Sequence, residues 1–106
     1  MNLLTFYIFI NGKITTFPTI VKARRAAVEK FDLSGWFSNT KTVQGEGIYC
    51  SKTHRTIGYA GFISSGKRVL YYHDDEGYHY LRLDGTLNGR LDRYDKKYVV
   101  DAENSD

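Results

Sequence analysis

The densest group of side chains that could do chemistry lies in residues 73–79, which read His-Asp-Asp-Glu-Gly-Tyr-His. Two imidazoles that flank a hairpin turn can meet across the ladder, and the carboxylates between them suit a hard divalent cation. The same residues also make a good turn, because aspartate caps nearby backbone amides and glycine accepts unusual backbone angles. Neither an HExxH motif nor an EF-hand loop is present. We therefore expect a turn here, and neither a metal nor another cofactor.

A second constellation consists of Gly-Ile-Tyr at residues 47–49 and Thr-Ile-Gly at residues 56–58. These runs resemble the signature of the GIY-YIG nucleases, in which two short strands place tyrosines beside a metal-bound phosphodiester. The resemblance implies a divalent-metal nuclease with Tyr49 at its site. The family has a tyrosine where this chain has Thr56, and it continues into a helix that carries an arginine, whereas we expect a strand here. A degenerate nuclease of this type is one alternative function.

A third constellation is Cys50 with His54, four residues later. A cysteine nucleophile needs a base within hydrogen-bond reach and a third group that orients the base. The other interpretation is a small half-buried cysteine at the end of a strand, and no third group stands out. Because Cys50 is the only cysteine, no intramolecular disulfide can form, which indicates a reducing, cytoplasmic location.

Basic residues are interspersed with aromatic residues in residues 67–73 and 78–82. In a strand, the two-residue period places Tyr78, Tyr80 and Arg82 on one face. Tyrosine and arginine are enriched at the centres of protein interfaces, and tyrosines flanked by basic groups can also stack bases. An ordinary amphipathic sheet would give the same pattern. We predict a partner-binding surface formed by Lys67, Arg68, Tyr71, Tyr72, Tyr78, Tyr80 and Arg82.

The elements that must position these residues begin with a hairpin. Residues 3–10 are predicted as a strand, Asn-Gly at residues 11–12 suits a type I′ turn, and residues 13–17 return as the second strand. A two-residue loop pairs Ile10 with Lys13 and fixes the register of the whole hairpin. This register places Phe6, Ile8 and Ile10 on one face and Tyr7 and Phe9 on the other.

A helix is predicted over residues 20–31. Pro18 breaks the preceding ladder, and Thr19 is placed to cap the helix. Arg25 and Glu29 are four residues apart on the polar side and can pair. Spacings of three and four give an apolar stripe made of Ile20, Ala23, Ala27, Val28 and Phe31.

The rest of the chain is predicted as short strands. We expect a loop with a short extended piece over residues 36–46, and strands at residues 47–50, 56–63, 68–73 and 78–83. An Asn-Gly turn at residues 88–89 folds residues 86–87 against 90–91, and residues 97–100 form a last edge strand. The fold class is therefore α+β, with the helix on one face of a mostly antiparallel sheet. The opposite face should be partly solvated and rich in tyrosine.

Length and charge complete the prediction. A chain of 106 residues fits a single domain, which we place at residues 1–100. Three of the 12 acidic residues lie in residues 101–106, so the domain has a net charge of +6 and is followed by an acidic, disordered tail. No segment approaches the ~20 apolar residues of a membrane span.

We expect a small non-catalytic protein that occupies a surface of a protein or a protein–nucleic-acid complex. In size and composition it resembles compact phage and mobile-element inhibitors of host complexes, anti-CRISPR proteins among them. The basic body supports an alternative, direct binding of nucleic acid. An exposed strand edge could also pair with a second copy, which would give a homodimer.

Overall fold

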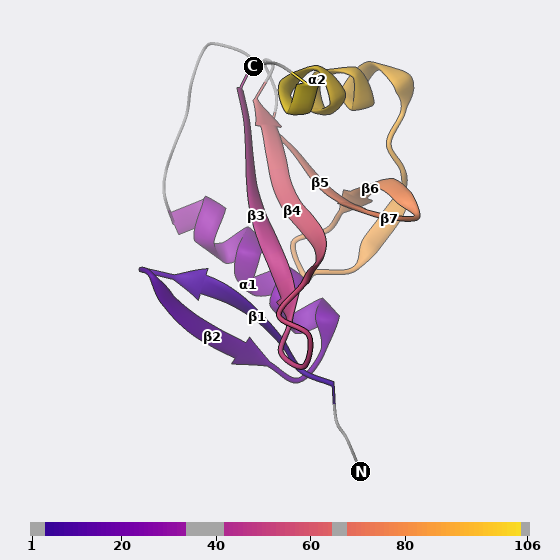
Figure 1. Ribbon diagram of the computed structural model, residues 1–106. Helices are drawn as coiled ribbons and strands as arrows, with labels where there is room; N and C mark the ends of the chain where they lie inside the picture. The colour runs from indigo at the N-terminus through magenta and orange to yellow at the C-terminus, as the bar shows by residue number, and fades with distance from the viewer. Residues whose placement is uncertain (1–3, 34–41, 65–67, 105–106) are drawn as a thin grey trace.

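The computed structural model describes residues 4–33, 42–64 and 68–104, which form one seven-stranded antiparallel sheet and two helices (Figure 1). In chain order the elements are β1 (Phe6–Ile10), β2 (Lys13–Phe17), α1 (Ile20–Leu33), β3 (Thr42–Cys50), β4 (Thr56–Ser64), β5 (Arg68–Asp74), β6 (Gly77–Leu81), β7 (Leu87–Arg90) and α2 (Arg93–Asn104). The strand order in the sheet is β2-β1-β3-β4-β5-β6-β7. The predicted α+β class with an N-terminal hairpin is confirmed.

The hairpin has the predicted register. Ile10 pairs with Lys13, and Phe6 pairs with Phe17. Asn11 and Gly12 both have positive φ, 51° and 78°, as a type I′ turn requires. Strand β1 begins at Phe6, so the predicted start at residue 3 was too early.

Helix α1 covers one face of the sheet, which we call the helix face. Its N-terminus is capped as predicted, because the backbone N–H of Lys22 donates to Thr19 Oγ1 over 3.2 Å. On the exposed side, Arg25 Nε lies 3.3 Å from Glu29 Oε1. The buried stripe of Ala23, Ala27, Val28 and Phe31 packs in one cluster with Ile8, Ile48, Ala60, Phe62, Tyr72 and Leu81.

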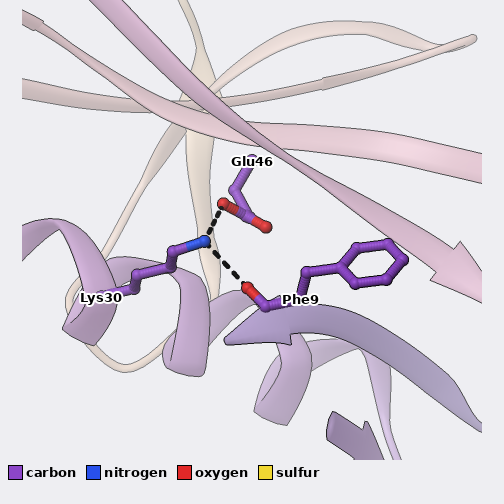
Figure 2. Close-up of polar contacts among 3 residues, drawn as sticks. All are labelled: Phe9, Lys30 and Glu46. Atoms are coloured by element: carbon purple, nitrogen blue, oxygen red, sulfur yellow. Dashed lines mark hydrogen bonds and ion pairs between the residues drawn. The ribbon is translucent and has the colours of Figure 1, made fainter. Parts of the chain in front are cut away.

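A lysine near the end of α1 ties the helix to two strands (Figure 2). The ladder between β1 and β3 ends at the pair Tyr7 and Tyr49. Beyond it, Lys30 Nζ donates to the Phe9 carbonyl oxygen over 2.8 Å and lies 2.6 Å from Glu46 Oε2. Lys30 thus binds a backbone carbonyl past the end of the ladder.

Helix α2 lies across the end of the sheet where β4 ends and β3 begins (Figure 1). Its N-terminus is capped by Asp92, whose Oδ1 accepts the N–H of Asp95 over 2.8 Å. The helix closes a second core cluster, which consists of Ile63, Val69, Tyr71, Leu91 and Val99. Neither helix in the described part of the chain has the length and apolar content that crossing a membrane requires.

Three predictions for the C-terminal part were wrong. Residues 97–100 are helical instead of an edge strand, because a short apolar run fits either structure and the Asp92 cap with Val99 burial favours the helix. The helix continues through residues 101–104, where a tail was expected. Asn88 and Gly89 lie inside β7, which pairs with β6, and do not form a hairpin turn.

Strand β3 is longer than predicted. It begins at Thr42, so residues 42–46 are a strand where a loop with a short extended piece was expected. These residues pair with the end of β4, and the whole ladder runs from Thr42 opposite Ser64 to Tyr49 opposite Thr56. Cross-strand pairing therefore overrides a polar, glycine-containing sequence that has weak strand propensity.

Candidate binding face

The sheet face opposite α1 carries a row of three stacked rings on adjacent strands. Tyr59 on β4 pairs with His73 on β5, which in turn pairs with Tyr78 on β6. The ring centroids of Tyr59 and His73 are 5.1 Å apart with planes at 29°, and those of His73 and Tyr78 are 4.8 Å apart at 10°. Lys96 Nζ of α2 lies 5.5 Å from the centroid of Tyr78. The row is therefore bounded by an ammonium group at its β6 end.

A second ring group lies on the same face over β1 and β3. Tyr7 stacks on Tyr49 with centroids 5.1 Å apart at 16°, and Phe9 meets both rings edge-on at 5.9 and 5.6 Å. A Cβ at Gly47 would lie 3.2 Å from the Tyr49 hydroxyl oxygen, so the Tyr49 ring leans over this glycine. Because Gly47 pairs with Tyr59, the two ring groups are neighbours.

We define the aromatic face as Tyr7, Phe9, Ile14, Tyr49, Tyr59, His73 and Tyr78. Ile14 belongs to it because it pairs with Phe9. Three of its members are exposed, with 38% of Phe9, 43% of Tyr59 and 57% of Ile14 accessible. Among the described residues these are half of the exposed large hydrophobic side chains, and they gather on one face.

A cleft of about 570 Å³ opens at one end of this face, between the β3–β4 loop and the β5–β6 turn. The ladder between β4 and β5 ends at Tyr59 and His73, and both residues line the cleft. Arg55 lines the β3–β4 side, and Asp74 and Asp75 line the β5–β6 side. The volume is within the range of small-ligand sites.

A buried arginine lies behind the cleft on the helix face. The Arg24 guanidinium carbon is 4.8 Å from the centroid of the Tyr72 ring, and Arg24 is only 8% exposed. Burial lowers the pKa of Arg24, and the charges of Tyr72 and Asp74 oppose this shift. Burial also raises the pKa of Tyr72 to about 12. The sequence prediction missed Arg24, although its position four residues before buried Val28 placed it beside the apolar stripe.

The predicted site tyrosines do not form one surface. Tyr71 and Tyr72 are buried, 3% and 2% exposed, in the core clusters on opposite faces of the sheet. Tyr80 donates to Asp95 Oδ2 over 2.7 Å, and this hydrogen bond raises its pKa to about 12. Of the predicted tyrosines, Tyr78 belongs to the aromatic face.

The predicted basic residues lie elsewhere. Arg82 follows the last residue of β6, which ends at Leu81 where the prediction extended the strand to residue 83. It donates to Thr86 Oγ1 and to Asn88 Oδ1 and so closes the β6–β7 loop. Arg68 is exposed, with its guanidinium 5.2 Å from the ring of Phe62 on the helix face. Lys67 lies outside the described residues.

The two histidines of residues 73–79 do not meet. His73 pairs with Tyr78 on the aromatic face, whereas His79 pairs with Tyr72 on the helix face. The turn chemistry is confirmed, because the Glu76 N–H donates to Asp74 Oδ1 over 2.9 Å. Within the described ranges, no three histidine, cysteine, aspartate or glutamate side chains are grouped to hold a metal ion.

Cys50 and His54 also lie on opposite faces. Cys50 pairs with Phe6, which packs against the helix-face core, while His54 Nδ1 lies 3.1 Å from the Tyr7 hydroxyl. Backbone N–H groups of Thr53 and Lys52 lower the pKa of the Cys50 thiol. The arrangement is not that of a cysteine–histidine dyad.

The runs that resemble the GIY-YIG signature do lie on adjacent antiparallel strands. Tyr49 pairs with Thr56, and Ile57 is an extra residue in the β4 ladder, since Ile48 pairs with Gly58. The next element is strand β5, where the nuclease family has a helix. In comparisons with known proteins, no protein-family model, no curated protein and no solved structure matches this chain.

Proposed function

We propose that the chain is a non-catalytic binding protein that lays its aromatic face on the surface of a partner protein. The observation that carries this proposal is the stacking of Tyr59, His73 and Tyr78 on one another across three strands. Stacked rings at strand spacing have their faces against each other, and their edges and hydroxyl groups lie outward. Edges and hydroxyl groups suit the mixed apolar and polar surface of a protein.

The same geometry disfavours single-stranded nucleic acid as the partner. A base stacks on a free ring face, whereas the faces between Tyr59, His73 and Tyr78 are occupied at 4.8 to 5.1 Å. Lys96 lies over Tyr78 at 5.5 Å. The exposed Phe9 and Ile14 extend the face with apolar area, which the centres of protein interfaces contain.

The test compares matched variants in capture of a partner from the source host. The Phe9→Ala/Tyr59→Ala double variant should reduce partner affinity at least about tenfold, because exposed aromatic anchors dominate interface energies. The matched control is Leu83→Ala/Tyr94→Ala, which removes exposed apolar area outside the aromatic face. Both variants must have the denaturant midpoint of the wild type, which shows that they are folded. Equal loss in the two, or loss in the control alone, would contradict the proposal.

Direct nucleic-acid binding is the second candidate, favoured by the net charge of +6 over residues 1–100. It predicts affinity that falls steeply with added salt, in proportion to the phosphates neutralised. We expect no such binding to single- or double-stranded DNA or RNA at 50 mM salt.

The mechanism expected of the protein-binding function is steric: the aromatic face occupies a surface of the partner. Inhibition of a host complex by a mobile-element protein stays a prediction, for which identification of the captured partner is the test.

A further inference from the structure

The ladders between β1 and β3 and between β4 and β5 each end before their strands do. Between β1 and β3, the Lys30 ammonium binds the Phe9 carbonyl just past the last pair (Figure 2). Between β4 and β5, pairing ends at Tyr59 and His73, while β4 extends back to Thr56. Thr56 and Gly58 therefore pair with β3 only, with Ile57 as the extra residue between them, and the other edge of this segment faces the cleft. Among the described residues, no side chain forms a hydrogen bond with the backbone of this edge, whereas Lys30 does so for β1.

The walls of this cleft are rigidly built. Tyr59 and His73 stack at the point where the ladder ends. A Cβ at Gly58 would overlap the Tyr72 hydroxyl, so the absence of a side chain lets the Tyr72 ring lie against this part of β4. Arg24 packs on that ring from behind, almost fully buried. Preorganised walls lower the entropic cost of binding.

The two sides of the cleft carry opposite charges that do not pair. Arg55 lies on one side, and Asp74 and Asp75 lie on the other. Among the described residues, no ion pair joins Arg55 to Asp74 or Asp75 across the cleft. An occupant that carries both charges would satisfy both sides.

We infer that the cleft binds an extended segment of a partner protein, which adds a short strand to the free edge of residues 56–58. The free edge is three residues long, which corresponds to about 10 Å of an extended partner segment. Main-chain hydrogen bonds would give affinity, and side chains would give specificity: an acidic one at Arg55 and a basic one at Asp75. The inference rests on the proposed function only in that the occupant belongs to a protein.

The test is an NMR titration of the full ¹⁵N-labelled chain with the capped peptide acetyl-EVTVR-amide. We expect shift changes confined to the amides of residues 55–59 and 73–75. The neutral peptide acetyl-QVTVQ-amide should bind about tenfold more weakly, because it lacks both charge-assisted contacts. Arg55→Gln and Asp75→Asn should each weaken the charged peptide severalfold. Lys52→Gln, an exposed change in the same loop outside the cleft, should leave it unchanged.

Three results would overturn the inference: no shift changes at these amides at 10 mM peptide, changes centred elsewhere, or equal affinity for the two peptides. Its failure is separable from that of the proposed function, because the titration needs no partner. If the wild-type chain binds the peptide and the Phe9→Ala/Tyr59→Ala variant keeps its partner affinity, the cleft inference stands and the aromatic-face proposal fails. If the variant loses partner affinity and the wild-type chain does not bind the peptide, the proposal stands and the inference fails.

Discussion

The two faces of the sheet stabilise aromatic rings in different ways. On the helix face, Phe62 is buried beside Phe31 of α1, with centroids 5.5 Å apart at 64°, and the helix excludes water. On the aromatic face, Tyr59 stacks on His73 while 43% of it stays exposed. A ring row in cross-strand register can thus be ordered without a covering layer. An open face of this kind remains available to a partner.

The largest expected effect tests this contrast directly. Phe62→Ala should lower the free energy of unfolding by about 4 kcal/mol, because it leaves a large cavity under α1. Tyr59→Ala should lower it by less than about 1 kcal/mol, since Tyr59 is 43% exposed and the ring contact that is lost is its stacking on His73. Chemical denaturation of both variants gives the two values. Similar losses would mean that the aromatic face is as important to folding as the core.

A pair of glycines on β3 and β4 provides the next comparison. Gly58→Ala should destabilise by about 2 kcal/mol, because the new methyl group overlaps the buried Tyr72 hydroxyl. Gly45→Ala should be almost neutral, since its Cβ would lie 3.6 Å from the Ala60 carbonyl and the Tyr71 hydroxyl, ordinary contact distances. The denaturation midpoints of the two variants measure this difference in stability. A tolerated Gly58→Ala would show that Tyr72 can move away from the cleft wall.

Local signals made the N-terminal half predictable from the sequence. The Asn-Gly turn fixes the backbone of residues 11–12 and therefore the pairing of Ile10 with Lys13. Thr19 and the apolar stripe specify α1 in the same way. Each of these features depends on residues a few positions apart.

The candidate site depended on long-range information and was mostly missed. The stacking of Tyr59, His73 and Tyr78 requires the register of β4, β5 and β6, which no short motif encodes. Tyr72 and Tyr80 look equally suited to binding in sequence, yet α1 and Asp95 of α2 engage them. Because residues 97–100 were predicted as an edge strand, the prediction did not contain the helix that covers Tyr71 and Tyr80.

A smaller effect tests how α2 is attached to the aromatic side of the sheet. Tyr80→Phe should destabilise by about 1.5 kcal/mol, because Asp95, only 1% exposed, loses the hydroxyl that its Oδ2 accepts from. Hydrogen exchange should rise first in α2, with α1 unchanged. Tyr59→Phe is the matched control, since that tyrosine is exposed. Uniform acceleration in both helices would contradict a local role for this hydrogen bond.

The last effect appears only at high pH, where the buried Tyr72 titrates. Burial raises the pKa of Tyr72 to about 12, above its ordinary value of 10, so the unfolded chain loses this proton first. The stabilisation from Tyr72 is therefore complete below pH 10 and is lost as the pH rises toward 12. In Tyr72→Phe the free energy of unfolding should fall less steeply between pH 10 and 12 than in the wild type. The same denaturation series measures both slopes, and a wild-type slope in Tyr72→Phe would refute the assignment to Tyr72.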